Sequence, residues 1–340
     1  MPFTVPIRIR TSPLLLVAVV LLLVALLASL VPAPASAAGI RKVAVTRNIT
    51  FTGTTTSPVQ LDVWKPAGAR GAPVLVLLHG GGWARSGRQE WDNNGWTGTF
   101  ARAGYVIVNA DYRLACNNGF TTVASLTDTD ISTRALPVKA DPALCNHTMA
   151  DALDDANAAV GWAATNARRY GGDPHRIVLM GGSAGAHLAL LVASEPNSPR
   201  SIRGVVAFSP PADIEWLNTY KRKLSEAVAA AIGCDFTTCP DQWRPYNPFR
   251  QVLAGASPVP TYIMRSRLDS VTPFGQVRTF ATAALRAGVP LTLHEPKNKM
   301  STCHGPWSCE RQGVAGTTRS LRLDVITWIR VRVLGGVGTY

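Results

Sequence analysis

The stretch IVLMGGSAGAHLALL, Ile177–Leu191, joins two apolar runs of different rhythm across a cluster of small residues. The run IVLM is continuously apolar and rich in β-branched residues, which is typical of a strand buried on both faces of a parallel sheet. The run AHLALLVA combines strong helix formers with an apolar face at helical spacing. The sequence therefore predicts a sharp turn from strand to helix with Ser183 at its corner.

Gly181 and Gly185 stand two residues before and two residues after Ser183. So tight a turn brings the strand and helix backbones together, and a Cβ at either glycine would collide. The pattern G-x-S-x-G is that of a nucleophile elbow, which holds a serine hydroxyl exposed at the end of a sheet. The alternative interpretation is a glycine-rich turn with an ordinary serine, because so short a motif also arises by chance.

Strand-like and helix-like segments alternate along most of the chain after a polar N-terminal segment. The expected strands are Gln60–Trp64, Val74–His79, Tyr105–Asp111, Ile177–Met180, Val205–Ser209, Thr261–Ser266 and Pro290–His294. The expected helices are Thr97–Ala103, Met149–Tyr170, Ala184–Ala193, Phe274–Ala287 and Thr318–Leu334. Such alternation predicts an α/β fold with a mostly parallel central sheet flanked by helices on both faces.

Two long segments interrupt this alternation. Ala115–His147 is a loop bracketed by Cys116 and Cys145, and Pro211–Val259 follows an expected strand. Long loops within compact domains are commonly functional, and loops at the carboxyl ends of parallel strands line the ligand crevice. We therefore expect the first segment to shape a substrate site and the second, at about 211–259, to form a small cap insertion.

The N-terminal segment has the pattern of a secretory signal peptide. It carries Arg8 and Arg10, then the uncharged run Leu14–Val31, and then the small residues Ala35-Ser36-Ala37. This order predicts a signal peptide over residues 1–37, followed by one extracytoplasmic catalytic domain over 38–340. The alternative is an uncleaved membrane anchor formed by residues 14–31, since the apolar run is long for a signal peptide.

Cysteine usage agrees with an exported protein, and the distribution of charge bears on its partners. Six cysteines fall into near-neighbour pairs, which predicts disulfides in an oxidising compartment and no C-x-x-C metal site. The pairs are Cys116 with Cys145, Cys234 with Cys239, and Cys303 with Cys309. The net charge of +13 is scattered rather than gathered in a stripe, so we expect no nucleic-acid partner.

A second motif, HGGGW at His79–Trp83, follows an expected strand. Consecutive glycines let backbone N–H groups approach a developing negative charge, as an oxyanion hole requires. The pentamer is far more specific than the serine motif. Together, the two motifs favour acyl transfer at Ser183 over the interpretation of a plain glycine turn.

With these motifs in place, the chain resembles α/β-hydrolases of the hormone-sensitive-lipase and carboxylesterase type, including the feruloyl-esterase and formamidase branches. The matching segments are LDVWKP, HGGGWARSG, AGYVIVNADYRLA, DDANAAVGWAATNARRYGGDPHRI, VLMGGSAGAHLALL, RSRLDSVTPFGQ and CHG. They occur in the expected order over most of residues 55–335. The elbow GGSAG departs from the GDSAG of many lipase-type members, which leaves the serine intact but weakens assignment to one branch.

The resemblance implies a catalytic triad in the chain order Ser, Asp, His. Ser183 would be the nucleophile, Asp269 in LDSVTP the acid, and His304 in CHG the base. The alternative for Asp269 is a turn aspartate, and the rival base is His294, which falls inside an expected strand. The implied oxyanion donors are the backbone N–H groups of Gly81, Gly82 and Ala184.

The remaining histidines have structural interpretations. We expect His79 to brace the glycine loop, His187 to lie on the helix behind the nucleophile, and His147 and His175 to occupy surface turns. None of this suggests a metal, and serine hydrolysis requires no cofactor. Trp83, directly after the oxyanion glycines, is expected to narrow the acyl pocket and so to contact substrate.

The resulting hypothesis is a secreted serine carboxylesterase that acts on short-chain or small-acyl esters, either as small molecules or linked to a polymer. One alternative is an amidase or peptidase that uses the same triad. A second is a non-catalytic interaction protein that keeps the α/β-hydrolase fold. An assay with a nitrophenyl ester separates these classes.

Overall fold

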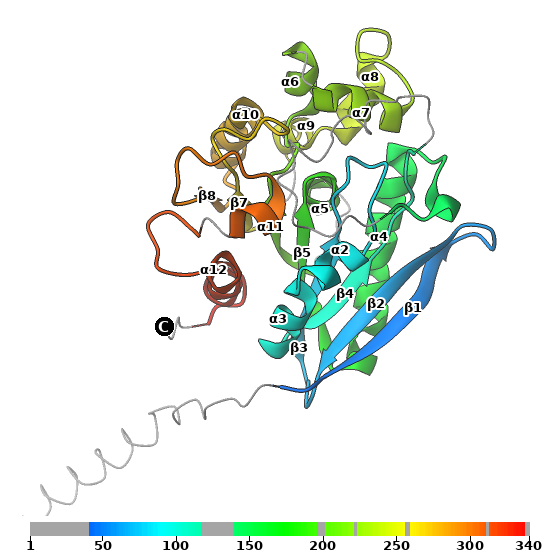
Figure 1. Ribbon diagram of the computed structural model, residues 1–340, viewed down its shortest axis with the longest axis vertical. Coiled ribbons are helices and arrows are strands. Elements are labelled where there is room, and N and C mark those ends of the chain that lie inside the picture. The colour runs from blue at the N-terminus through cyan, green and yellow to red at the C-terminus, as the bar shows by residue number, and fades with distance from the viewer. Residues whose placement is uncertain are drawn as a thin grey trace, which may run out of the picture. The chain divides into compact units, whose positions relative to one another are not determined.

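In the part of the chain that the computed structural model describes, eight strands form one sheet in the order β1-β2-β4-β3-β5-β6-β7-β8 (Figure 1). Their bounds are β1 Val43–Gly53, β2 Pro58–Pro66, β3 Ala72–Leu78, β4 Val106–Ala110, β5 Gly172–Gly182, β6 Ile202–Phe208, β7 Thr261–Met264 and β8 Leu291–His294. β1 and β2 run antiparallel, and β4, β3, β5, β6, β7 and β8 are mutually parallel. The predicted α/β fold with a mostly parallel sheet is confirmed.

The described residues are 41–116, 139–195, 201–220, 223–255, 259–310 and 313–336. They all belong to one compact unit, Arg41–Tyr340. The predicted signal peptide and the middle of the 115–147 loop lie outside the described residues. Within these ranges, no helix has the length and apolar character needed to cross a membrane.

The helices match the predicted ones and add several more. Their bounds are α2 Gln89–Asn93, α3 Trp96–Arg102, α4 Met149–Asn166, α5 Ala184–Ser194, α6 Ile214–Thr219, α7 Lys223–Ile232, α8 Pro240–Trp243, α9 Pro248–Leu253, α10 Phe274–Arg286, α11 Gly305–Glu310 and α12 Leu321–Trp328. A capping box between Thr148 and Asp151 opens α4, in which each residue's side chain accepts the other's backbone N–H. The segment between β6 and β7, predicted as the cap, contains α6 to α9.

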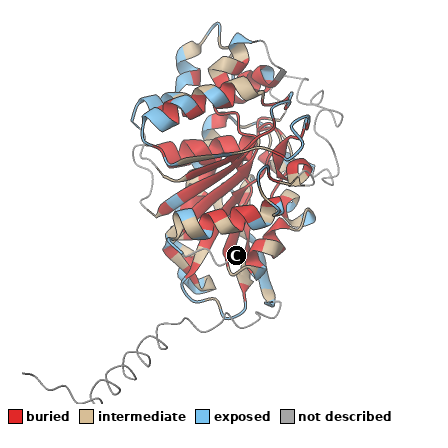
Figure 2. Ribbon diagram, turned by 90° about the vertical axis from the view of Figure 1, so that its left-hand side faces the viewer, coloured by how far each residue is buried: buried red, intermediate tan, exposed pale blue. Residues whose placement is uncertain are grey.

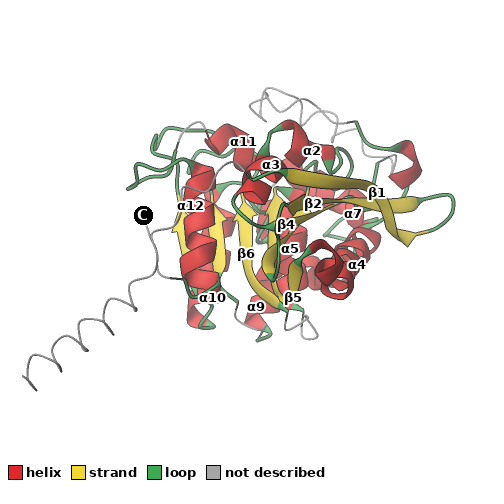
Figure 3. Cartoon of the chain, turned by 90° about the horizontal axis from the view of Figure 1, so that it is seen from below, coloured by secondary structure: helices red, strands yellow, loops and turns green. Residues whose placement is uncertain are grey.

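Two hydrophobic cores cover the faces of the sheet. Val74, Val76 and Leu78 of β3 join side chains of α4, α5 and α10, whereas Leu75 and Leu77 join side chains of α3 and α12. The sheet is therefore buried on both faces, as Figure 2 shows by the red central strands between two layers of helices. Figure 3 shows the helices on either side of the strands. This burial explains why the central strands are continuously apolar rather than alternating.

The strand β1 was not predicted. Most of its residues are solvent-exposed, and its pairing with β2 shifts register between Thr46 and Ile49 and again between Thr50 and Thr52. A shift in register breaks the alternation by which an edge strand is recognised in sequence. The sequence of this segment therefore looks polar and irregular, although most of its residues pair with β2.

The registers of the central strands bring four strand ends to one edge. Leu78 pairs with Gly181, Gly182 pairs with Phe208, and Phe208 pairs with Met264. The residues that follow β3, β5, β6 and β7 therefore emerge side by side at the carboxyl edge, where parallel sheets place their ligand sites.

Three disulfides pair all six cysteines, as predicted. They join Cys116 to Cys145, Cys234 to Cys239, and Cys303 to Cys309. The first closes the base of the 115–147 loop, and the second lies between α7 and α8. The third closes a small ring that holds His304.

Candidate active site

Ser183 occupies the turn between β5 and α5 in a strained backbone conformation, with φ 50° and ψ −117°. A Cβ on Gly181 would lie 2.3 Å from the Gly185 carbonyl carbon, and one on Gly185 would lie 2.2 Å from the Leu78 carbonyl oxygen. Neither position can accept a side chain without moving backbone. The flanking glycines thus make the close turn possible, and the turn leaves Ser183 partly exposed at the edge of the sheet.

The HGGGW loop lies against this turn. A Cβ on Gly80 would lie 3.6 Å from the Cβ of Ser183. Gly81 has φ 110° and its carbonyl accepts the N–H groups of Ala84 and Arg85, which curls the loop back on itself. No hydrogen bond to another described residue involves the N–H of Gly81, Gly82 or Ala184.

His79 and Tyr112 support the loop from beneath. Their rings stack at 4.1 Å, and the Tyr112 hydroxyl donates to the carbonyl of His79 at 2.9 Å. His79 is fully buried, and its Nδ1 lies 2.8 Å from the Gly80 carbonyl. Burial lowers the pKa of His79 and keeps the ring neutral. This arrangement agrees with the bracing role expected for His79.

His304 and Asp269 form a buried pair at the same edge. His304 Nδ1 lies 2.8 Å from Asp269 Oδ2, and the two residues are 4% and 3% exposed. The other Asp269 oxygen accepts the backbone N–H groups of Val271 and Thr272, each at 2.9 Å. With Nδ1 engaged, His304 Nε2 is the free ring nitrogen, and it is buried with no hydrogen-bond partner in the described residues.

The loop that carries His304 contacts the serine turn directly. A Cβ on Gly182 would lie 3.1 Å from Pro306 Cδ. The residue before Ser183 therefore lies against the second residue after His304. The structure thus brings the serine turn, the glycine loop and the His304–Asp269 pair to one place.

His294, the rival base, lies elsewhere. Its ring stacks on Tyr262 at 4.5 Å and its Nδ1 is 3.7 Å from Asp324 Oδ2. Burial lowers the pKa of His294. Its contacts tie β8 to β7 and α12 and include none of the residues around Ser183.

His187 and Trp83 both lie behind the site. His187 is fully buried on α5, and its Nε2 lies 2.8 Å from the carbonyl of Tyr246, which belongs to the segment between β6 and β7. Trp83 is only 1% exposed and meets the His187 ring edge-on at 5.1 Å. Its carbonyl accepts the N–H of Ala115 at 2.7 Å, which joins the glycine loop to the base of the 115–147 loop.

A family comparison covers most of this arrangement. The family model BD-FAE matches residues 61–140 and 143–284, which is more than half of the chain. The chain belongs to the BD-FAE family. This family is a hormone-sensitive-lipase-like carboxylesterase family, as the sequence resemblance implied. The BD-FAE match includes Ser183 and Asp269 and ends before His304.

Curated relatives of this BD-FAE member are esterases. The chain is 26% identical over 245 residues to the probable carboxylic ester hydrolase LipM of Mycobacterium tuberculosis, covering 65% of this chain and 47% of that protein. It is 31% identical over 152 residues to carboxylesterase NlhH of the same organism, covering 43% and 36%. The chain thus spans about half or less of the length of the curated relatives it matches.

A solved structure shares the BD-FAE chain's fold. Esterase 2 of Thermogutta terrifontis, phosphonylated by sarin, superposes with a TM-score of 0.58 at 21% identity, covering 85% of this chain and 92% of that one. At this identity the likeness concerns the fold.

Two residues that position the pair were missed in the sequence. The Ser209 hydroxyl accepts the Gly305 N–H at 3.0 Å, and the backbone carbonyl of Ser209 lies 3.2 Å from the Thr272 hydroxyl. That hydroxyl also lies 2.9 Å from Asp269 Oδ2. The available signals were the place of Ser209 directly after a central strand and the three-residue spacing from Asp269 to Thr272.

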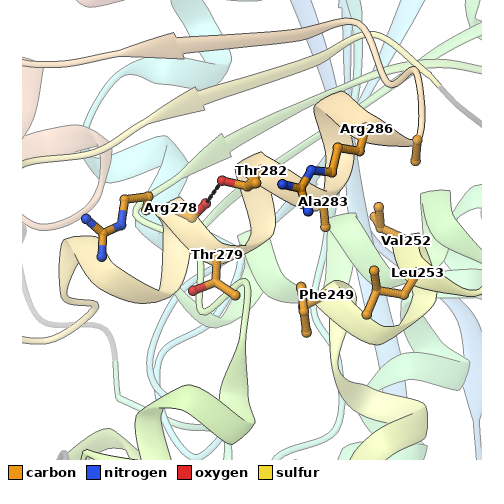
Figure 4. Close-up of a pocket in the computed structure, with 9 residues that line it drawn as sticks. Phe249, Val252, Leu253, Arg278, Thr279, Thr282, Ala283 and Arg286 are labelled. Carbon is orange, nitrogen blue, oxygen red and sulfur yellow. Dashed lines mark hydrogen bonds between the residues drawn. The ribbon is translucent and has the colours of Figure 1, made fainter.

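A groove of about 550 Å³ lies between α9 and α10, apart from these residues (Figure 4). Its apolar side is formed by Phe249, Val252 and Leu253, and Arg278 and Arg286 stand on the α10 side. Its lining includes none of the predicted site residues. Among the described residues, no group of three or more His, Cys, Asp or Glu side chains is placed to hold a metal ion.

Proposed function

We propose that this protein is a carboxylesterase that forms an acyl-enzyme on Ser183, with His304 as the base and Asp269 as the residue that orients it. One observation carries the proposal: the strained serine turn contacts a loop whose histidine is already bonded to a buried aspartate through Nδ1. Nucleophile, base and orienting group are the three parts that acyl transfer at serine requires. The family and its esterase relatives support the same activity.

The reaction follows from the free ring nitrogen of His304. Nε2 takes the proton of Ser183 Oγ as the oxygen attacks the ester carbonyl, and a tetrahedral oxyanion forms. The imidazolium then gives that proton to the leaving alcohol as the C–O bond breaks. Water repeats both steps, so that the acid leaves and Ser183 regains its proton. Asp269 holds the Nδ1–H tautomer throughout and stabilises the imidazolium.

The oxyanion is stabilised by backbone donors. Gly81, Gly82 and Ala184 supply N–H groups with no competing acceptor in the described chain. Ala184 is the first residue of α5, so the positive end of the helix dipole also faces the developing charge. Removal of one donor from such a site typically costs about 3–4 kcal/mol of transition-state stabilisation.

We further propose that the acyl group is short and that the enzyme works outside the cytoplasm. Trp83 directly follows the oxyanion glycines in the chain and is buried against the His187 ring, and in this proposal its bulk narrows the acyl side of the site. The cap buries Leu224, Ala227 and Val228 in the main core, which leaves these side chains unavailable to a lipid. Three disulfides support an oxidising compartment, as does the pattern of a signal peptide over residues 1–37.

Hydrolysis of p-nitrophenyl esters of increasing acyl length tests this proposal. We expect turnover to be highest with acetate to butyrate esters and to fall towards longer chains, as the proposed narrowing of the acyl side by Trp83 requires. p-Nitroacetanilide, the matched amide, should be hydrolysed far more slowly. An optimum at twelve carbons or longer would contradict the short-acyl assignment. Hydrolysis of the amide faster than that of the esters would favour an amidase. If neither substrate is hydrolysed, a non-catalytic protein would be favoured.

A further inference from the structure

Glu90 joins two loops of the proposed active site that are far apart in sequence. Its Oε2 accepts the backbone N–H of Gly80 at 2.9 Å and the Ser86 hydroxyl at 3.1 Å. Its Oε1 accepts the indole N–H of Trp307 at 3.0 Å. One carboxylate therefore binds the glycine loop through one oxygen and the segment after His304 through the other.

Each loop reaches the reacting groups by a short path. Gly80 precedes the proposed oxyanion donors and lies against Ser183. Trp307 lies in α11, which begins one residue after His304, inside the ring closed by the Cys303–Cys309 disulfide. The Trp307 ring packs edge-on against Trp91, the neighbour of Glu90, at 4.8 Å. Both ends of the bridge are thus held in place.

We propose that Glu90 is a positioning residue that sets the distance between the oxyanion glycines and His304. The inference rests on the proposed function, because that distance matters only if both groups act on one substrate. Acyl transfer is sensitive to small misplacements of its groups. The Gly80 and Trp307 donors require an acceptor on each side of residue 90, and only a carboxylate supplies two acceptor oxygens.

This requirement makes the glutamine variant informative. In Glu90→Gln one oxygen becomes an NH₂ donor, which must face either the Gly80 N–H or the Trp307 N–H. In Trp307→Phe the indole donor is gone, and the amide NH₂ can occupy that side while its oxygen still accepts from Gly80. The second substitution should therefore relieve the first.

A double-mutant cycle on p-nitrophenyl acetate hydrolysis tests this coupling. We expect Glu90→Gln to lower kcat at least tenfold in the otherwise unchanged protein, with KM within twofold. In the Trp307→Phe background, the same change should lower kcat less than threefold. Glu195→Gln is the matched control: it alters a carboxylate that accepts from Asn157, and turnover should stay within twofold.

The outcomes distinguish the positioning role of Glu90 from a general loss of structure and from failure of the proposed function. Equal fold-losses from Glu90→Gln in both backgrounds, or an unchanged kcat in the single variant, would overturn the positioning role. Hydrogen exchange of the Trp307 indole N–H, followed by NMR, should accelerate in Glu90→Gln, and unchanged exchange would also overturn it. Absence of turnover in the unmodified protein would instead overturn the proposed function.

Discussion

Ser183 and His304 reach the same place by different physical means. Ser183 is held by a local constraint, since two glycines allow β5 and α5 to meet at a strained turn. His304 is held by contacts distant in sequence, through Asp269 at Nδ1 and through Ser209, which accepts the N–H of Gly305. The serine was therefore visible in a local motif. The histidine was implied only by resemblance.

The first prediction separates His304 from His294. We expect His304→Ala to lower kcat/KM for p-nitrophenyl acetate by about a thousandfold or more, because no other described imidazole is bonded to Asp269. His294→Ala should change kcat/KM less than tenfold, since its partners are Tyr262 and Asp324. Steady-state kinetics on both variants decides between them, and the reverse ranking would assign the base to His294.

Residue-level prediction succeeded where chemistry and geometry share one short motif. A Cβ on Gly181 would lie 2.3 Å from the Gly185 carbonyl carbon in the same turn, and one on Gly185 would lie 2.2 Å from the Leu78 carbonyl oxygen at the end of β3. Both glycines belong to the short motif, although one of the two contacts is made by a neighbouring strand. Glu90, Ser209 and Thr272 carry no such motif. Their roles depend on α2, α11 and the segments after β6 and β7 meeting at one edge, and a single sequence does not show which segments meet there.

At the scale of elements, the short helices, including those between β6 and β7, could not be predicted from the sequence pattern. The long helices α4 and α10 have an apolar face and were predicted within a few residues, whereas α2, α8 and α11 are four to six residues long. Helices so short are stabilised by tertiary packing rather than by propensity. α11 is held by the packing of Trp307 against Trp91 and by the Cys303–Cys309 disulfide. Neither interaction produces a helical repeat of apolar residues in the sequence.

The second prediction concerns the Cys303–Cys309 ring, whose cysteines are six residues apart. In the chain-entropy model so small a loop contributes only about 2 kcal/mol, whereas the 29-residue separation of Cys116 and Cys145 corresponds to almost 4 kcal/mol. The ring should therefore matter more for the position of His304 than for global stability.

We expect Cys303→Ser/Cys309→Ser to lose most of its turnover number while its melting temperature falls by only a few degrees. The matched control is Cys234→Ser/Cys239→Ser, which opens a ring of similar size between α7 and α8. It should change turnover little. Full turnover in the first variant, measured beside its thermal unfolding, would show that the ring does not order the base.

At the scale of the whole molecule, buried histidines make stability depend on pH. Burial lowers the pKa of His187 to about 4, partly offset by its hydrogen bond to the Tyr246 carbonyl. An unfolded histidine titrates near 6.5, so between about pH 6.5 and 4 the unfolded chain binds more protons. The free energy of unfolding must therefore fall as pH falls through this window. Burial lowers the pKa of His79 and His294 in the same direction.

The third prediction follows from this decrease in the free energy of unfolding as pH falls. Between pH 7 and pH 4.5, His187 alone should cost the native state about 2–3 kcal/mol. In His187→Gln the side chain can still donate to Tyr246 but does not titrate, so its loss of stability over the same interval should be smaller by about that amount. Urea unfolding at both pH values measures the difference. Parallel pH profiles for the two proteins would mean that His187 is not buried neutral.

The central claim, that Ser183 is the nucleophile activated by His304, is tested most directly by covalent capture. A p-nitrophenyl alkylphosphonate should release one equivalent of p-nitrophenol per chain. Peptide mass spectrometry should then place the phosphonyl group on Ser183, with no labelling in Ser183→Ala and much slower labelling in His304→Ala. A phosphonyl group on any other residue, or equal labelling of the Ser183→Ala protein, would contradict the account.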